Sequence, residues 1–104
     1  MTPTHRPPTP PGEILLQEFL VPRGISQVEL ASRMGVPVQR VNTIVNGKRG
    51  ITAETALLLS EVLDTSPRLW LDLQADHDLW QASKKRERAA ERAGGARSRK
   101  SRPA

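Results

Sequence analysis

The 104-residue chain contains no cysteine and only three aromatic residues, Phe19, Trp70 and Trp80. Without cysteine it can form no disulfide and no cysteine-ligated zinc or iron–sulfur site, and such a small domain suits a reducing compartment. No apolar run approaches the roughly 18 residues that a membrane span needs, and the proline-rich start MTPTHRPPTPPGE lacks a signal peptide's hydrophobic core. We therefore expect a soluble, cytoplasmic protein.

Common catalytic and metal-binding motifs are also missing. The sequence has no HExxH, no glycine-rich phosphate loop and no nucleophile paired with a base. His5 lies in the proline-rich leader, and His77 falls on an apolar face of a predicted helix. Asp76, His77 and Asp78 are consecutive, and successive helical residues point about 100° apart, so they do not converge on one ion. The sequence predicts no enzyme, no catalytic residue, no cofactor and no metal site.

Most of the excess positive charge lies at the C-terminus. The net charge is +5, yet residues 84–104 carry nine basic side chains against two acidic ones, whereas residues 1–83 carry seven basic and nine acidic ones. The isoelectric point of the whole chain is therefore weak support for DNA binding. The composition of residues 83–104 predicts a basic, mostly disordered tail.

Capping residues and apolar periodicity predict five helices in residues 10–82, after a flexible leader at 1–9. The first helix is capped by Thr9 or a neighbouring backbone group and stops at Pro22 with Gly24. The second begins with a capping box of Ser26 and Glu29 and ends at Gly35, and the third follows Val36 and Pro37 and ends near Asn46-Gly47. Thr52 caps the fourth, and Ser66 caps the fifth, which spans 66–82.

The stretch from Ser26 to Lys48, SQVELASRMGVPVQRVNTIVNGK, is typical of two short helices joined by a tight turn. In a helix-turn-helix the second helix enters the major groove of DNA, and the first lies across the phosphates. Glutamine and asparagine can bond adenine N6 and N7 together, and valine can touch a thymine methyl. Such side chains form the predicted exposed edge of the second helix of this motif, which is the third helix of the chain: Val38, Gln39, Asn42 and Thr43. The alternative is a solvated polar face that binds nothing.

Residues around this edge are candidates for phosphate contacts. Gln27, at the start of the first helix of the motif, can offer its amide and its backbone N–H to a phosphate. Asn46 either only closes its helix or also contacts a phosphate. Basic residues give positions 24–50 a local charge of +3 in an otherwise acidic body. The predicted DNA-contacting residues are Gln27, Val38, Gln39, Arg40, Asn42, Thr43, Asn46, Lys48 and Arg49.

The predicted helix 66–82 has an apolar stripe that looks too wide for a body of this size to bury. A large exposed apolar patch on a small protein favours a partner surface. We predict a homodimer through this helix, which would place two reading helices roughly 34 Å apart on a palindromic operator. The alternative is that the stripe is only internal core. The predicted dimer interface consists of Leu69, Trp70, Leu73, His77 and Trp80.

From about residue 10 to 82 the chain resembles the HigA antitoxins of the Xre-type helix-turn-helix class. The resemblance lies in the PGEIL opening, the NGKRGIT link, the SPRLWLDLQ segment and the final LW. It implies an all-α, five-helix, lambda-repressor-like domain that dimerises through its C-terminal helix and represses its own operon. It also implies a partner, a HigB-like toxin that cleaves mRNA in the manner of RelE. The DNA contacts that the resemblance implies are Gln27, Gln39, Arg40, Asn42, Thr43 and Lys48.

Other functions and surfaces remain open from the sequence. The chain could be a stand-alone repressor without a toxin, or an interaction module in which the helix-turn-helix is only a scaffold. Val38 departs from the glutamine that many phage-type repressors carry at that position, which leaves the operator sequence open. RelE-like toxins are typically basic, so an acidic docking face is favoured over the tail: Glu13, Glu18, Asp72, Asp76 and Asp78.

Overall fold

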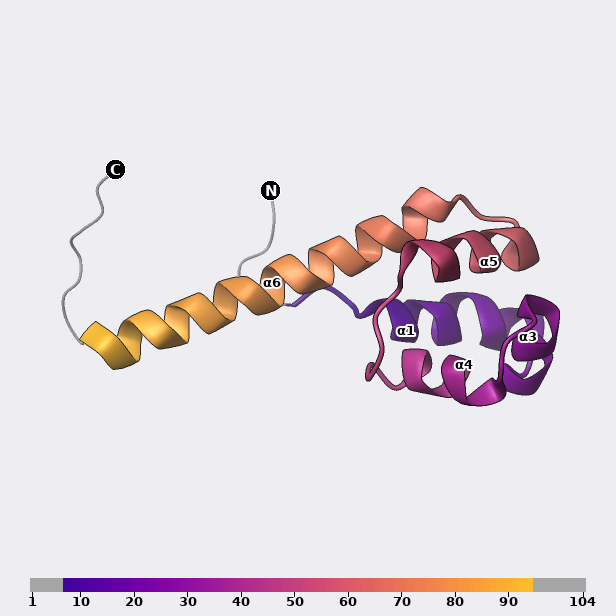
Figure 1. The fold of residues 1–104 in the computed structure, drawn as a ribbon, viewed down its shortest axis with the longest axis horizontal. Helices are drawn as coiled ribbons and strands as arrows, with labels where there is room; N and C mark the ends of the chain where they lie inside the picture. The colour runs from indigo at the N-terminus through magenta and orange to yellow at the C-terminus, as the bar shows by residue number, and fades with distance from the viewer. Residues whose placement is uncertain (1–6, 95–104) are drawn as a thin grey trace.

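The computed structural model describes residues 7–94, and all regular structure in that range is helical. The prediction of an all-α domain with five helices is confirmed, because the first three elements follow one another without a break and form one helix (Figure 1). The elements are α1 (Pro11–Ile14), η1 (Leu15–Leu20), α2 (Val21–Arg23), α3 (Gln27–Met34), α4 (Val38–Val45), α5 (Ala53–Leu63) and α6 (Pro67–Gly94).

The first helix agrees with its prediction at its start and differs from it at Pro22. Of the two predicted caps, Thr9 or a neighbouring backbone group, the structure has the second, since the Pro10 carbonyl accepts two N–H bonds at 3.1 Å. At the other end the helix passes through Pro22 and ends at Gly24, whose φ of 67° is left-handed. Gly24 therefore ends the helix as predicted, and only the role predicted for Pro22 in stopping it is wrong.

A π-helical turn explains how proline is tolerated there. Proline has no N–H, and its ring crowds the carbonyl four residues earlier in a regular helix. Here η1 widens the turn just before Pro22, and the Val21 N–H donates to the Leu16 carbonyl, five residues back. Single π-helical turns of this kind occur within otherwise regular α-helices.

Side-chain caps begin α3, α5 and α6 as predicted, whereas α4 starts after Pro37 without a side-chain cap. The hydroxyl oxygens of Ser26, Thr52 and Ser66 each accept a bond from the backbone N–H three residues later, at 3.0, 3.3 and 3.1 Å. Gly35 ends α3 with a φ of 73°. The Glu29 carboxylate of the predicted capping box pairs with Arg33 one turn further on. Local sequence signals therefore determine where α3, α5 and α6 begin.

The core gathers apolar residues from each of the five helices around Trp70. The Trp70 side chain is fully buried, its ring centroid lies 5.2 Å from that of Phe19, and its indole N–H donates to the Thr65 hydroxyl at 2.7 Å. Trp70 therefore has no surface to offer to a second copy, and its predicted place in a dimer interface is wrong. The buried apolar residues are Leu15, Leu20, Leu30, Ala31, Met34, Val41, Ile44, Ile51, Ala56, Leu59, Leu63 and Trp70.

Helix α6 is longer than predicted. Its first half packs on α1 and α5, and its second half projects beyond the body (Figure 1). The predicted disordered tail is helical up to Gly94, because Lys, Arg, Glu and Ala are strong helix formers; residues 95–104 of that prediction lie outside the described residues. Residues 7–9 have no regular structure. The rest of the predicted leader, residues 1–6, lies outside the described residues. Within the described residues, no helix combines the length and apolarity needed to cross a bilayer.

Candidate nucleic-acid interface

Helices α3 and α4 form the predicted pair joined by a tight turn. The turn is closed at Gly35, and the Val36 N–H donates to the Ala31 carbonyl at 3.0 Å. Buried apolar side chains hold the two helices to each other and to the core, among them Leu30, Met34, Val41 and Ile44. Because Val41 and Ile44 face inward, the opposite face of α4 is presented to solvent.

This outward face carries the predicted base-reading side chains. Gln39, Asn42 and Asn46 are exposed, and Val38 at the start of the helix keeps 36% of its surface accessible. The amides of Gln39 and Asn42 make no hydrogen bond within residues 7–94 and so retain their full donor and acceptor capacity. Thr43 is half-buried, and its hydroxyl donates to the Arg40 carbonyl at 3.0 Å.

Arg40 does not lie on this outward face with the other candidates. Its guanidinium turns toward α5, where it pairs with the Glu54 carboxylate at 3.2 Å and donates to the Thr55 hydroxyl at 3.3 Å. Its Nε atom is buried without a hydrogen-bond partner among the described residues. In this structure Arg40 therefore ties α4 to α5, a role that the sequence reading missed.

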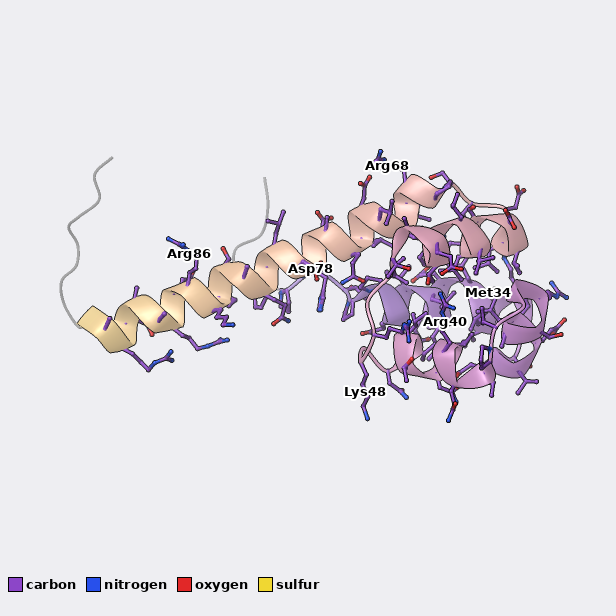
Figure 2. All side chains as sticks on the ribbon, viewed as in Figure 1. Met34, Arg40, Lys48, Arg68, Asp78 and Arg86 are labelled. Carbon is purple, nitrogen blue, oxygen red and sulfur yellow. The ribbon has the colours of Figure 1, made fainter. Side chains whose placement is uncertain are left out.

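The candidates for phosphate contacts flank the outward face. Lys48 and Arg49 are exposed on the link between α4 and α5, and Lys48 points away from the body (Figure 2). Their backbone N–H groups both donate to the Thr43 carbonyl, at 2.8 and 3.2 Å, which wraps the start of the link over the end of α4. Asn46 is the exposed C-cap of α4, and Gln27 is half-buried in the first turn of α3.

Gly12 fixes the C-terminal end of α4 against the first helix. A β-carbon on Gly12 would lie 2.0 Å from the Ile44 carbonyl oxygen and 2.9 Å from that of Val45. Only glycine permits this approach of two backbones. The sequence reading did not select Gly12, although it lies in the PGEIL opening that carries part of the family resemblance.

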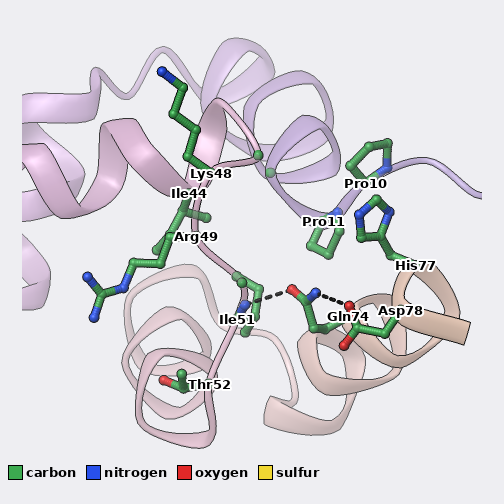
Figure 3. Close-up of a pocket in the computed structure, with 13 residues that line it drawn as sticks. Pro10, Pro11, Ile44, Lys48, Arg49, Ile51, Thr52, Gln74, His77 and Asp78 are labelled. Atoms are coloured by element: carbon green, nitrogen blue, oxygen red, sulfur yellow. Dashed lines mark hydrogen bonds between the residues drawn. The ribbon is translucent and has the colours of Figure 1, made fainter. Parts of the chain in front are cut away.

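A hollow of about 460 Å³ lies beside this contact (Figure 3). Its wall is formed by the start of the first helix, the link after α4 and one face of α6. Gln74 of α6 spans the wall, since its carbonyl oxygen accepts the Ile51 N–H at 2.7 Å and its amide donates to Asp78 at 2.9 Å. Figure 3 shows the His77 ring beside Pro10 on the same side of the hollow.

The residues of the predicted dimer interface do not share one exposed surface. Leu69 and Leu73 are half-buried and pack on the chain's own core, and His77 lines the hollow. Trp80 is half-buried under the Lys84 ammonium, which lies 5.3 Å from the ring centroid. Leu79 is 69% exposed and was not among the predicted interface residues. The apolar surface that remains on α6 is therefore centred on Leu79 and Trp80.

Two short helices around a left-handed glycine, with free amides on the second, define a helix-turn-helix DNA-binding protein. A helix-turn-helix family model matches residues 16–70. Antitoxin HigA-1 of Vibrio cholerae is 41% identical over 80 residues, which cover 77% of this chain and 75% of that protein. The HTH-type transcriptional regulator YbaQ of Escherichia coli is 43% identical over 76 residues, covering 73% of this chain and 67% of that protein.

A solved structure shows the same likeness. The antitoxin HigA of Pseudomonas aeruginosa, solved with the higBA promoter, is 39% identical, with a TM-score of 0.76 over 82% of this chain and 92% of that one. Fold, motif and sequence agree across these comparisons. The chain belongs to the HigA-type antitoxins of the helix-turn-helix family.

Proposed function

We propose that this chain is the antitoxin of a HigBA-like type II toxin–antitoxin system. In the cytoplasm it would bind the operator of its own operon as a homodimer, and it would neutralise a RelE-like, mRNA-cleaving toxin. The observation that carries the DNA-binding part is the outward face of α4, where the amides of Gln39 and Asn42 are free of internal partners among residues 7–94. The names of two relatives, HigA-1 and HigA solved with a promoter, support the antitoxin part.

We assign base reading to α4 and phosphate binding to its flanks. Gln39 and Asn42 have the chemistry to contact adenine, each worth about 1–3 kcal/mol of discrimination, and Val38 can cover a thymine methyl. Arg40 is kept on α5 by Glu54, so we assign it to holding α4 rather than to DNA. The phosphate contacts would come from the remaining polar and basic candidates: Gln27, Thr43, Asn46, Lys48 and Arg49.

The dimer would form through α6. Trp70 is excluded by its burial, so the contact would be made by the outer parts of Leu69, Leu73 and His77 together with Trp80. Leu79 adds the largest exposed apolar side chain on this helix. Dimerisation would set two α4 helices about one turn of DNA apart, roughly 34 Å, on a palindromic site.

The toxin would bind the acidic face of the body. Glu13, Glu18, Asp72, Asp76 and Asp78 are all exposed. Opposite charge speeds encounter and excludes wrong partners, and RelE-like toxins are typically basic. Toxin affinity measured on the chain truncated after Ser83 tests this surface. Retained affinity supports the acidic face, and loss of affinity assigns the toxin contact to the removed residues 84–104.

Operator binding is tested by replacing Gln39 and Asn42 with alanine together. We expect this variant to lose preference for operator over scrambled DNA in fluorescence anisotropy, while the matched variant Ser32→Ala, exposed on α3, keeps it. Truncation after Ser83 should leave the preference intact. If the truncation abolishes binding and the double variant does not, the helix-turn-helix is only a scaffold.

A stand-alone repressor is the second candidate, because YbaQ, a relative of comparable identity, is named only as a transcriptional regulator. The two functions differ in the product of the neighbouring gene. Co-expression with that product should rescue growth and yield a co-purifying complex if the chain is an antitoxin. A neighbouring product that is harmless and does not bind favours the stand-alone repressor.

A further inference from the structure

Gln74 connects α6 to the link that follows the helix-turn-helix. Its carbonyl oxygen accepts the backbone N–H of Ile51 at 2.7 Å, across 23 residues of sequence, and its amide donates to the Asp78 carboxylate at 2.9 Å (Figure 3). Ile51 is 5% exposed, so its N–H depends on this partner. Leaving a buried N–H without a partner destabilises the fold, which makes this bond a strong local constraint.

The Gln74 side chain is also closely packed against the link. A β-carbon built on Gly50 would lie 3.2 Å from the three terminal atoms of the Gln74 side chain. The glycine therefore leaves just enough room for the amide to reach the link. At the other end of the link, the Thr43 carbonyl holds the N–H groups of Lys48 and Arg49.

Lys48 and Arg49 are held at the Thr43 anchor, shortly before the Gln74 anchor at Ile51, and their side chains extend away from the link (Figure 3). We propose that Gln74 is a positioning residue for DNA binding, which fixes the link so that Lys48 and Arg49 meet the phosphate backbone. The inference rests on the proposed operator binding and extends it to α6, a helix outside the DNA-binding motif.

The base-reading helix does not share this anchor. Helix α4 is held by its buried residues Val41 and Ile44, by the Gly12 contact and by the Arg40–Glu54 pair. Replacement of Gln74 should therefore release the phosphate contacts of Lys48 and Arg49 and leave base reading in place. Phosphate contacts are visible in the salt dependence of affinity, because each contributes about 0.9 to the slope of log K against log salt.

The test is Gln74→Leu in the full-length protein, titrated with operator and with scrambled DNA at several salt concentrations. We expect both affinities to fall by the same factor, roughly fivefold at about 0.15 M salt for each phosphate that the link no longer reaches. The salt slope should fall by about 0.9 per phosphate, with the operator preference unchanged. Gln81→Leu, on an exposed position of the same helix, should match the wild type.

Rescue separates positioning from general damage to the fold. Gln74→Glu alone sets a new carboxylate beside that of Asp78 and should weaken binding. Adding Asp78→Asn rebuilds the chain of bonds, because the carboxylate at position 74 can accept from the Ile51 N–H and from the new amide at position 78. The double variant should therefore regain the wild-type salt slope. Lys48→Ala should lower the slope in the wild type and lower it much less in Gln74→Leu.

A wild-type slope in Gln74→Leu, or failure of the double variant to restore it, would overturn the assignment. The proposed function fails on a different result, namely wild-type protein that binds operator and scrambled DNA equally. Circular dichroism on each variant confirms that the compared proteins are folded.

Discussion

The start of the first helix and the end of α4 touch backbone to backbone, because a β-carbon on Gly12 would lie 2.0 Å from the Ile44 carbonyl oxygen. Gly12→Ala must push the two helices apart. Overpacking of this kind costs about 1–3 kcal/mol, and we expect a loss of that size in urea denaturation. Operator affinity should fall as well, because α4 moves. Gln17→Ala, exposed on the same helix, should change neither quantity.

A second prediction is that the Arg40–Glu54 pair contributes to stability and not to DNA binding. Arg40→Ala and Glu54→Ala should each lower the free energy of unfolding, and a double-mutant cycle should show a coupling of about 0.2–1 kcal/mol, since the Glu54 side chain is 73% exposed. Neither variant should change the salt slope of operator binding. A slope lowered by about 0.9 in Arg40→Ala alone would return Arg40 to the phosphate contacts.

The centre of the core is predicted to depend on Trp70. Trp70→Ala removes a fully buried ring and should cost about 3–5 kcal/mol, enough to unfold much of a small domain. Thr65→Val leaves the indole N–H without its acceptor at 2.7 Å and should cost about 1–3 kcal/mol. Urea denaturation measures both losses. Thr65→Ser keeps the hydroxyl and should stay close to the wild type.

Trp80 is predicted to matter for association rather than for folding. Trp80→Ala with Leu79→Ser removes the apolar surface of α6 that the body leaves uncovered. Sedimentation velocity should show a shift from dimer to monomer at concentrations where the wild type is dimeric, with helix content unchanged. Operator affinity should fall with the dimer, because one protomer binds only one half-site. A variant that stays dimeric would place the interface elsewhere.

Local signals in the sequence were enough to predict where α3, α5 and α6 begin and which face of α4 is exposed. Ser26, Thr52 and Ser66 each cap the helix that they were expected to cap, since a cap bond spans only three residues. The inward positions Val41 and Ile44 followed from helical periodicity, and so did the exposure of Gln39 and Asn42.

Contacts between residues that are distant in the sequence could not be predicted from these local signals. Gly12 of the first helix meets Ile44 of α4, and Arg40 of α4 meets Glu54 of α5. Periodicity on one helix holds no information about such neighbours. The burial of Trp70 was missed for the same reason, since the sequence does not show how much of a stripe the body can cover. The helix through Pro22 required a π turn that no residue type in this segment indicates.

The two tryptophans of this chain give it two built-in optical probes in different surroundings. Trp70 is sealed beside Phe19, so its emission should remain that of an apolar site until the core opens. Trp80 is half-exposed and lies under the Lys84 ammonium, so its emission should respond to whatever covers the outer part of α6. With Trp70→Phe or Trp80→Phe as references, unfolding and association can be followed separately in the otherwise unlabelled protein.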